Sequence, residues 1–363
     1  MTVRLWLTLA LTGAVLVLPL FAPLTPACCP APPFGKSVVN ADQTVVILWD
    51  EAAKTEHFIR KASFKSEADD FGFLVPSPAV PELEESGSAA FPYLQKLTEP
   101  ETKKVPRPSG GVGCGCGGAP PNDFSRVADK ADVQVLAEKE VAGLKASVLK
   151  TESADALVKW LKENGYAFSP QVEAWAKPYV EAGWMITAFK VIKSKDAAEQ
   201  ARVAATSLRM SFKTDRPLFP YREPDPKDAA KALGANHRLL RIYFVAEARY
   251  RGELTKDEPW TGKVAWAGKL ADGDRKKALE LLKLPENTGP AEWWLTEFED
   301  AWPYRAAPAD VTFSRDPDQS TVRRPPILLY VSSPWPTDVT VYAMAAMVIV
   351  PPLVRRMRRD RNG

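Results

Sequence analysis

Apolar and polar positions are most regularly spaced between Gly143 and Ile192, where the pattern predicts a strand, two helices and a strand. Apolar residues recur at three- and four-residue intervals in two stretches, the spacing of a helix with one buried face. The flanking stretches are short and apolar, which is typical of strands. The predicted elements are Leu144–Leu149, Ala154–Glu163, Pro170–Glu181 and Trp184–Ile192.

Residues with known end preferences bound the two helices. Ser153 is placed to cap the first helix, and Gly165 supplies the left-handed residue that ends it. Pro170 begins the second helix, where its missing N–H costs nothing, and Gly183 ends it. The strand Trp184–Ile192 has apolar residues at both odd and even positions, and therefore on both faces. This predicts a position inside a mixed sheet that is covered on both faces.

The same criteria predict further elements along the chain. They indicate six more strands and two more helices. The strands are Thr44–Trp49, His57–Phe64, the short apolar run Phe71–Val75, Thr206–Phe212, Arg238–Arg249 and Ile327–Val331, and the helices are Ala89–Leu97 and Asp274–Leu282. We therefore predict an α+β fold, a mixed sheet with packed helices. A signal segment precedes this fold, and a hydrophobic helix follows it at the C-terminus.

The N-terminus has the pattern of a secretory signal. Arg4 supplies a positive start, Leu5–Leu18 is apolar, and small residues up to Ala27 offer a cleavage site. We predict that residues 1–27 are a signal peptide and that the body is extracytoplasmic, either periplasmic or at the cell surface. The signal could instead remain as an uncleaved anchor, or Cys28 could be acylated after cleavage.

The C-terminus has the pattern of a membrane anchor. Val339–Val354 contains no charged residue, and five arginines follow it within residues 355–363. This is the positive-inside arrangement, although the uncharged run is short for a bilayer. We predict a single span over residues 336–354, a cytoplasmic tail at 355–363, and a cell-membrane location; a buried terminal helix is the alternative.

The distribution of charge excludes one class of partner. The chain carries a formal net charge of +3. Arg4 contributes +1 and the C-terminal tail contributes a net +4, so the body carries about −2. A body this close to neutrality lacks the basic surface that nucleic-acid binding requires. We expect no nucleic-acid partner.

The four cysteines form two close pairs, Cys28 with Cys29 and Cys114 with Cys116. In an oxidising compartment an even cysteine count favours disulfides, and adjacent cysteines bridge each other poorly. We predict bridges between the two pairs, which would attach the mature N-terminus to the glycine-rich loop around Cys114. The alternatives are a metal site formed by all four thiolates, a redox-active Cys-x-Cys pair, and free thiols.

No other set of residues forms a recognisable catalytic motif. His57 and His237 are the only histidines, and nothing in the sequence brings them together. Asp69 and Asp70 suggest a solvated turn more than a cation site. Nothing indicates a cofactor. The sequence leaves open whether the chain is an enzyme, and the lack of a recognisable catalytic motif argues against an enzyme.

The tryptophans within 251–310 suggest core or interface anchors, with glycan binding as the alternative.

Several motifs together resemble one family of exported bacterial proteins. They are the exported start with cysteines, the run from Ala68 to Pro81, the Gly-Cys-Gly-Cys-Gly loop, Leu157–Tyr166 and Pro178–Trp184. This combination is similar to the DUF2330 family. The resemblance implies one extracytoplasmic domain over residues 28–335, with 251–310 as a candidate Trp-rich insertion. It transfers no catalytic residue.

These observations favour an uncharacterised cell-envelope protein that is anchored in the membrane. We expect a non-catalytic binding or structural module, whose partner is an envelope protein or a glycan. The competing hypothesis is an envelope thiol-redox or metal-binding protein that uses Cys28, Cys29, Cys114 and Cys116.

Overall fold

The computed structural model describes most of the chain between residues 29 and 331, in two compact units. The first unit comprises Met1–Thr98 and Gly117–Arg323, and the second comprises Glu99–Cys116 and Arg324–Gly363. The described residues are 29–31, 38–40, 43–61, 64–66, 72–106, 133–166, 170–191, 207–223, 237–254, 259–303 and 307–331. The predicted signal and the predicted membrane segment lie outside these ranges.

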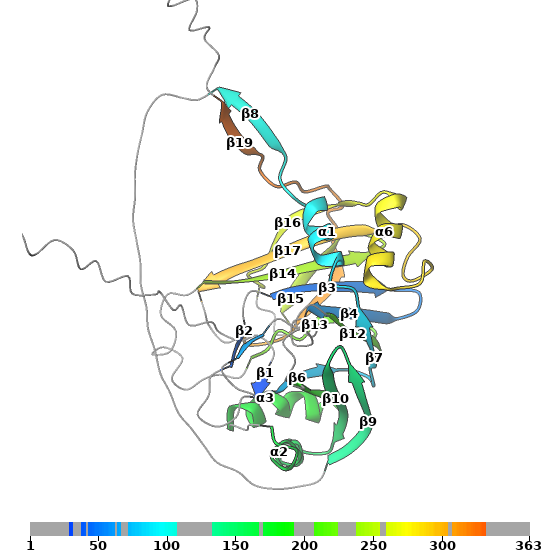
Figure 1. Cartoon of the computed structure of the whole chain (residues 1–363), viewed down its shortest axis with the longest axis vertical. Helices are drawn as coiled ribbons and strands as arrows, with labels where there is room; N and C mark the ends of the chain where they lie inside the picture. The colour runs from blue at the N-terminus through cyan, green and yellow to red at the C-terminus, as the bar shows by residue number, and fades with distance from the viewer. Residues whose placement is uncertain are drawn as a thin grey trace, which may run out of the picture. The chain divides into compact units, whose positions relative to one another are not determined.

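A seven-stranded sheet is the largest element of the first unit (Figure 1). Its strand order is β16-β17-β14-β3-β4-β12-β7. Strands β14 and β3 are parallel, and every other neighbouring pair is antiparallel, so the sheet consists of two antiparallel halves joined at one parallel pair. The strands are β3 (Gln43–Asp50), β4 (Thr55–Lys61), β7 (Glu82–Ser86), β12 (Ser207–Lys213), β14 (His237–Ala246), β16 (Lys263–Lys269) and β17 (Trp294–Pro303).

Helices α1 (Ala90–Leu97) and α6 (Asp272–Leu282) cover one face of this sheet (Figure 1). Each helix presents one apolar stripe, because its apolar residues recur at three- and four-residue intervals. Both predicted helices are confirmed, with boundaries that differ by at most two residues. The stripes contact the sheet in one cluster with Val46, Leu48, Ile59, Tyr243, Val245 and Leu295.

The second sheet has five antiparallel strands in the order β1-β6-β11-β10-β9. These are β1 (Cys29–Ala31), β6 (Gly72–Ser77), β9 (Val133–Val141), β10 (Leu144–Thr151) and β11 (Met185–Val191). Helices α2 (Ala154–Glu163) and α3 (Pro170–Glu181) pack on one face. The predicted central block is confirmed, and the Ser153 hydroxyl accepts the N–H of Ala156 at 3.2 Å. Strand β11 is interior, as predicted, but its sheet is antiparallel.

The main core lies between these sheets. It joins the face of the seven-stranded sheet away from α1 and α6 to the five-stranded sheet and to a three-stranded sheet. The three-stranded sheet has the order β13-β18-β15, formed by β13 (Leu218–Phe219), β15 (Tyr250–Leu254) and β18 (Val311–Arg315). Strands β2 (Val38–Asn40) and β5 (Phe64–Ser66) form a separate antiparallel pair.

In the second unit, β8 (Thr102–Pro106) and β19 (Ile327–Val331) form a two-stranded parallel ribbon. More than two hundred residues separate the two strands in the sequence, so a parallel pair here needs no tight turn. The strand predicted at Ile327–Val331 is confirmed.

The predicted α+β class is wrong. The described residues contain nineteen strands and four helices, and the architecture is mostly β with several sheets. The predicted C-terminal hydrophobic helix is not among those four, and residues 336–354 lie outside the described ranges. Buried polar residues inside strands, such as Glu56, Arg60 and Glu297, obscure the period-two alternation that would have predicted a β protein.

Candidate functional site

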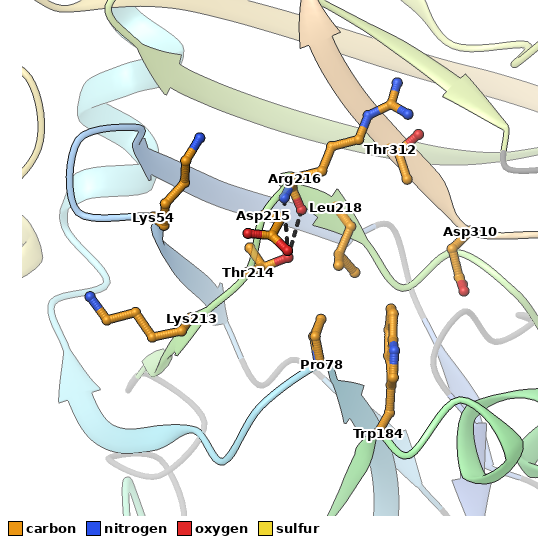
Figure 2. Close-up of a pocket in the computed structure, with 10 residues that line it drawn as sticks. All are labelled: Lys54, Pro78, Trp184, Lys213, Thr214, Asp215, Arg216, Leu218, Asp310 and Thr312. Carbon is orange, nitrogen blue, oxygen red and sulfur yellow. Dashed lines mark hydrogen bonds between the residues drawn. The ribbon is translucent and has the colours of Figure 1, made fainter.

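An open cleft of about 530 Å³ lies where the loop after β12 faces the ends of β6, β11 and β18 in the first unit (Figure 2). Figure 2 shows Lys54 and Lys213 on one side of the cleft, with Trp184 and Asp310 on the other. The lining residues are Lys54, Pro78, Trp184, Lys213, Thr214, Asp215, Arg216, Leu218, Asp310 and Thr312.

The loop after β12 forms one wall of the cleft. The Thr214 hydroxyl donates to the Arg216 carbonyl at 2.8 Å and accepts the Arg216 N–H at 3.4 Å, which closes a tight turn. The Thr214 N–H donates to the Lys54 carbonyl at 3.1 Å. The loop is therefore attached to the β3–β4 hairpin, and the two form one wall.

Two lysines on this wall line the cleft with exposed side chains, and in Figure 2 both side chains extend away from Trp184. The Lys213 ammonium donates to the Ala53 carbonyl at 2.7 Å and to the Thr55 hydroxyl at 2.8 Å. Both acceptors are neutral, so these bonds orient the charge without cancelling it. Lys54 has a carboxylate 3.9 Å away, on Glu51, and both of these side chains are half exposed. Such an exposed pair attenuates the lysine charge only weakly.

Arg216 forms a closer ion pair than Lys54 does. Its guanidinium lies 3.1 Å from the Glu253 carboxylate, and its Nε donates to the Phe313 carbonyl at 3.3 Å. In Figure 2 the guanidinium points away from the lysine side of the cleft. Arg216 therefore fastens the loop to β15 and β18, and the lysines carry the charge that a ligand can meet.

Trp184 in the opposite wall is held by the end of α3. The Gly183 N–H donates to the Val180 carbonyl, and the Trp184 N–H donates to the Tyr179 carbonyl, each at 2.9 Å. Gly183 has a φ of +72°, and these two bonds form a Schellman motif. The indole centroid lies 5.5 Å from the Tyr179 ring, and the side chain is half-buried. The fold thus fixes the indole and leaves part of it exposed in the cleft.

Asp310 lines the same side of the cleft as Trp184 and belongs to a buried polar network. Its Oδ1 accepts the Tyr179 hydroxyl at 2.7 Å and the Arg222 N–H at 3.0 Å. Burial raises the pKa of Asp310, and the bonds from Arg222 and Tyr179 oppose that rise. Burial, together with the Asp310 carboxylate, raises the pKa of Tyr179 well above its ordinary value. The Trp175 indole N–H also donates to the Arg222 carbonyl at 2.9 Å. Helix α3 is therefore bonded directly to the β18 side of the cleft.

Glu56 lies behind the loop, fully buried in β4. Its Oε2 accepts the Leu218 N–H at 2.8 Å, and its Oε1 has no hydrogen-bond partner among the described residues. Burial raises the pKa of Glu56 well above its usual value, and the bond from Leu218 only partly offsets this. The carboxyl group therefore holds the start of β13 from inside the core.

The predicted cysteine site falls largely outside the described residues. Cys28, Cys114 and Cys116 are outside them, and Cys29 begins β1, where its backbone pairs with Leu74. The bridges and the alternative thiolate metal site stay predictions. Within the described ranges, no three His, Cys, Asp or Glu side chains converge on a position that could hold a metal ion. Asp69 and Asp70 are also outside these ranges.

The two histidines belong to different strands of the seven-stranded sheet. The Nδ1 of His57 lies 2.8 Å from the Ser211 hydroxyl on the neighbouring strand β12. Burial lowers the pKa of His57 to about 4, and the nearby positive charge of Arg209 lowers it further. His237 begins β14, which β3 separates from β4. The fold places His57 in a structural contact, not in the cleft.

Most of the tryptophans of the 251–310 region are core residues. Trp260, Trp266, Trp293 and Trp294 are all at most 9% exposed, which excludes their rings as a stacking surface. This region also contributes β16 and β17 to the seven-stranded sheet. The residue that the sequence interpretation missed is Trp184. An indole immediately after a helix-ending glycine was the signal that could have identified it.

Within the described ranges, no helix is both long and apolar enough to span a bilayer.

A protein-family model described as "Uncharacterized protein conserved in bacteria (DUF2330)" matches residues 23–314, which is well over half of the chain. The resemblance inferred from the motifs is therefore confirmed. No curated protein and no solved structure matches the chain.

Proposed function

The chain belongs to the DUF2330 family, and we propose that it is an extracytoplasmic binding module held at the cell membrane by its C-terminus. The cleft beside Trp184 is its binding site. The ligand is an acidic saccharide, which combines a ring that stacks on the indole with an anionic group that meets Lys54 and Lys213.

The observation that carries this proposal is the placement of a partly exposed indole across the cleft from two exposed lysines. An indole offers a flat, apolar face with little conformational freedom, which suits stacking on a sugar ring. Among the described residues, the Lys213 ammonium has only neutral acceptors, so an anionic group at the rim would gain an ion pair without displacing one of these contacts.

The wall beside Trp184 adds the polar groups that a saccharide requires. The Asp310 carboxyl and the Thr312 hydroxyl line the same wall, and both can form hydrogen bonds with sugar hydroxyls. A cleft that combines an apolar ring with a few placed polar groups is typical of small-ligand sites. A nucleic acid would need a longer basic track than two lysines.

The location of the module rests on the two ends of the sequence. Residues 1–27 have the pattern of an export signal, and Val339–Val354 is an uncharged run followed by five arginines. In the full-length protein, deletion of Val339–Gly363 should move the body from the membrane fraction to the soluble fraction. A truncated protein that still sediments with membranes would contradict the anchor.

Binding can be measured by calorimetry with muropeptides, soluble cell-wall fragments that carry both sugar rings and carboxylates. We expect Trp184→Leu to weaken binding about five- to thirtyfold, since one stacked ring contributes about 1 to 2 kcal/mol. Lys213→Gln should weaken binding to muropeptides and leave binding to neutral chitin oligosaccharides unchanged.

Trp160 provides a matched control for the stacking residue. It is also a half-buried tryptophan beside a tyrosine, with its ring centroid 5.7 Å from that of Tyr166, but it does not line the cleft. Trp160→Leu should bind muropeptides as the unaltered protein does. Equal binding by Trp184→Leu, or equal losses in both variants, would contradict the proposed site, as would a protein that binds neither ligand.

A further inference from the structure

The β8–β19 ribbon exposes apolar side chains that no described residue covers. Ile327 is 51% exposed, Leu328 is 45% exposed and Leu329 is 47% exposed. Successive residues of a strand point to opposite faces, so both faces of the ribbon carry apolar groups. Parallel strands are almost always covered on both faces, and an isolated pair of strands is marginal in water. The ribbon therefore requires a second surface.

The strand paired with these residues supplies positive charge. The register places Leu328 opposite Lys103 and Leu329 opposite Lys104. Both lysines are exposed, and the one carboxylate near Lys103, on Glu101, is 3.9 Å away and highly exposed. The surface that covers the ribbon must accept apolar groups and ammonium groups together on a strip a few residues long.

We propose that the ribbon is embedded in the headgroup layer of the membrane, with its apolar side chains at the acyl boundary and its lysines on anionic lipid phosphates. This inference rests on the membrane attachment in the proposed function. It adds a second contact, made by the folded protein itself, to the attachment through the C-terminal segment.

Chain length supports a membrane in preference to a distant partner. Only residues 332–338 separate the end of β19 from Val339, where the uncharged run begins. An extended chain of this length spans at most about 30 Å. When Val339–Val354 lies in the bilayer, the ribbon must therefore lie within this distance of the bilayer surface, and a shorter path brings it into the headgroups.

The unpaired backbone groups of the ribbon indicate how deep it lies in the membrane. The outer edges of β8 and β19 carry N–H and C=O groups that no strand of the described residues pairs, because the sheet has two strands there. Such groups are not tolerated in the hydrocarbon interior, but water and phosphates satisfy them in the headgroup layer. Lysine side chains can also extend from this depth to the phosphates. The ribbon is thus suited to the interface and not to the bilayer centre.

Photo-crosslinking in the full-length protein tests this inference. p-Benzoylphenylalanine in place of Leu328, and separately in place of Ile327 on the opposite face, is irradiated in vesicles that contain phosphatidylglycerol. The adducts are then identified by mass spectrometry. We expect lipid adducts at both positions, severalfold above those formed with the same probe in place of Lys276, an exposed residue of α6. The substitutions Lys103→Gln and Lys104→Gln together should lower the yield to that in phosphatidylcholine vesicles.

The possible outcomes distinguish a failure of the ribbon contact from a failure of the C-terminal anchor. Adducts to a second copy of the chain or to another protein, or yields no higher than at position 276, would overturn the ribbon contact. If the full-length protein does not sediment with the vesicles, the anchor of the proposed function fails. If it does sediment and positions 327 and 328 give no lipid adducts, only the ribbon inference fails.

Discussion

The Tyr179 hydroxyl donates a 2.7 Å hydrogen bond to Oδ1 of Asp310 across 131 residues of sequence, and both side chains are buried. This bond connects a helix on the five-stranded sheet to the start of β18 in the three-stranded sheet. The Tyr179 ring also supports the indole of Trp184, so the bond positions one wall of the cleft.

Tyr179→Phe removes this bond and keeps the ring. We expect the free energy of unfolding to fall by about 1 to 3 kcal/mol, because the buried Asp310 carboxyl loses one of its hydrogen-bond donors. Chemical denaturation measures this loss. Tyr93→Phe is the matched control, since the Tyr93 hydroxyl makes an equally short bond, to Asp274, at a partly exposed site. The control should lose less than about 1 kcal/mol, and equal losses would contradict the importance of burial.

Glu56→Gln tests the buried carboxyl behind the cleft loop. Burial raises the folded-state pKa of Glu56, so the protonated form is favoured in the folded protein and stability falls as pH rises from the unfolded value toward the folded one. Glutamine can accept the Leu218 N–H without ionising. We expect the variant to be more stable than the unaltered protein at pH 8, by the order of 1 kcal/mol, and about equal to it at pH 4.

Thermal unfolding of both proteins at several pH values measures this difference. Glu85→Gln, at an exposed residue of β7, is the control and should show no such dependence on pH. A Glu56→Gln protein that is less stable at pH 8 would show that the carboxylate is tolerated in the core.

The lowered pKa of His57 predicts that the folded protein loses stability in acid. Its folded-state pKa of about 4 lies below the ordinary 6.5, so the unfolded chain binds the proton more strongly between these values. The stability that His57 contributes is therefore fully present above pH 6.5 and is lost as pH falls toward 4. The shift corresponds to about 3 kcal/mol.

His57→Asn removes the titration and preserves a polar group that can reach the Ser211 hydroxyl. We expect the difference in unfolding free energy between pH 7 and pH 4.5 to be smaller in this variant, as measured by urea denaturation. An unchanged difference would assign the acid sensitivity to other groups.

The sequence specified local structure where short-range signals were strong. Ser153, Gly165 and Pro170 marked helix ends correctly, because caps and breakers act within a few residues. The overall class was not predictable in the same way. The parallel pairing of β14 with β3 joins segments almost two hundred residues apart, and no local pattern encodes such a pairing.

The cleft was missed for a related reason. Its walls combine Lys54, Pro78, Trp184, Lys213 and Asp310, which come from separate loops and strand ends. Each residue is ordinary in its own segment, and only the packing of the three sheets brings the set together. The burial of Trp260 and Trp293 likewise depends on long-range packing, so a local cluster of tryptophans could not distinguish core anchors from a binding surface.

The cysteine prediction is independent of the described fold and can be tested directly. Cys28-Cys29 begins the predicted mature chain, and Cys114 and Cys116 flank one glycine, so neither pair alone has good bridging geometry. Bridges between the pairs would close a loop of roughly 85 residues and stabilise the fold by about 4 kcal/mol. Non-reducing proteolysis and mass spectrometry of protein from its own compartment should find the two cysteine regions linked. Four free thiols would contradict the bridges, and bound zinc or copper in that sample would favour the metal site instead.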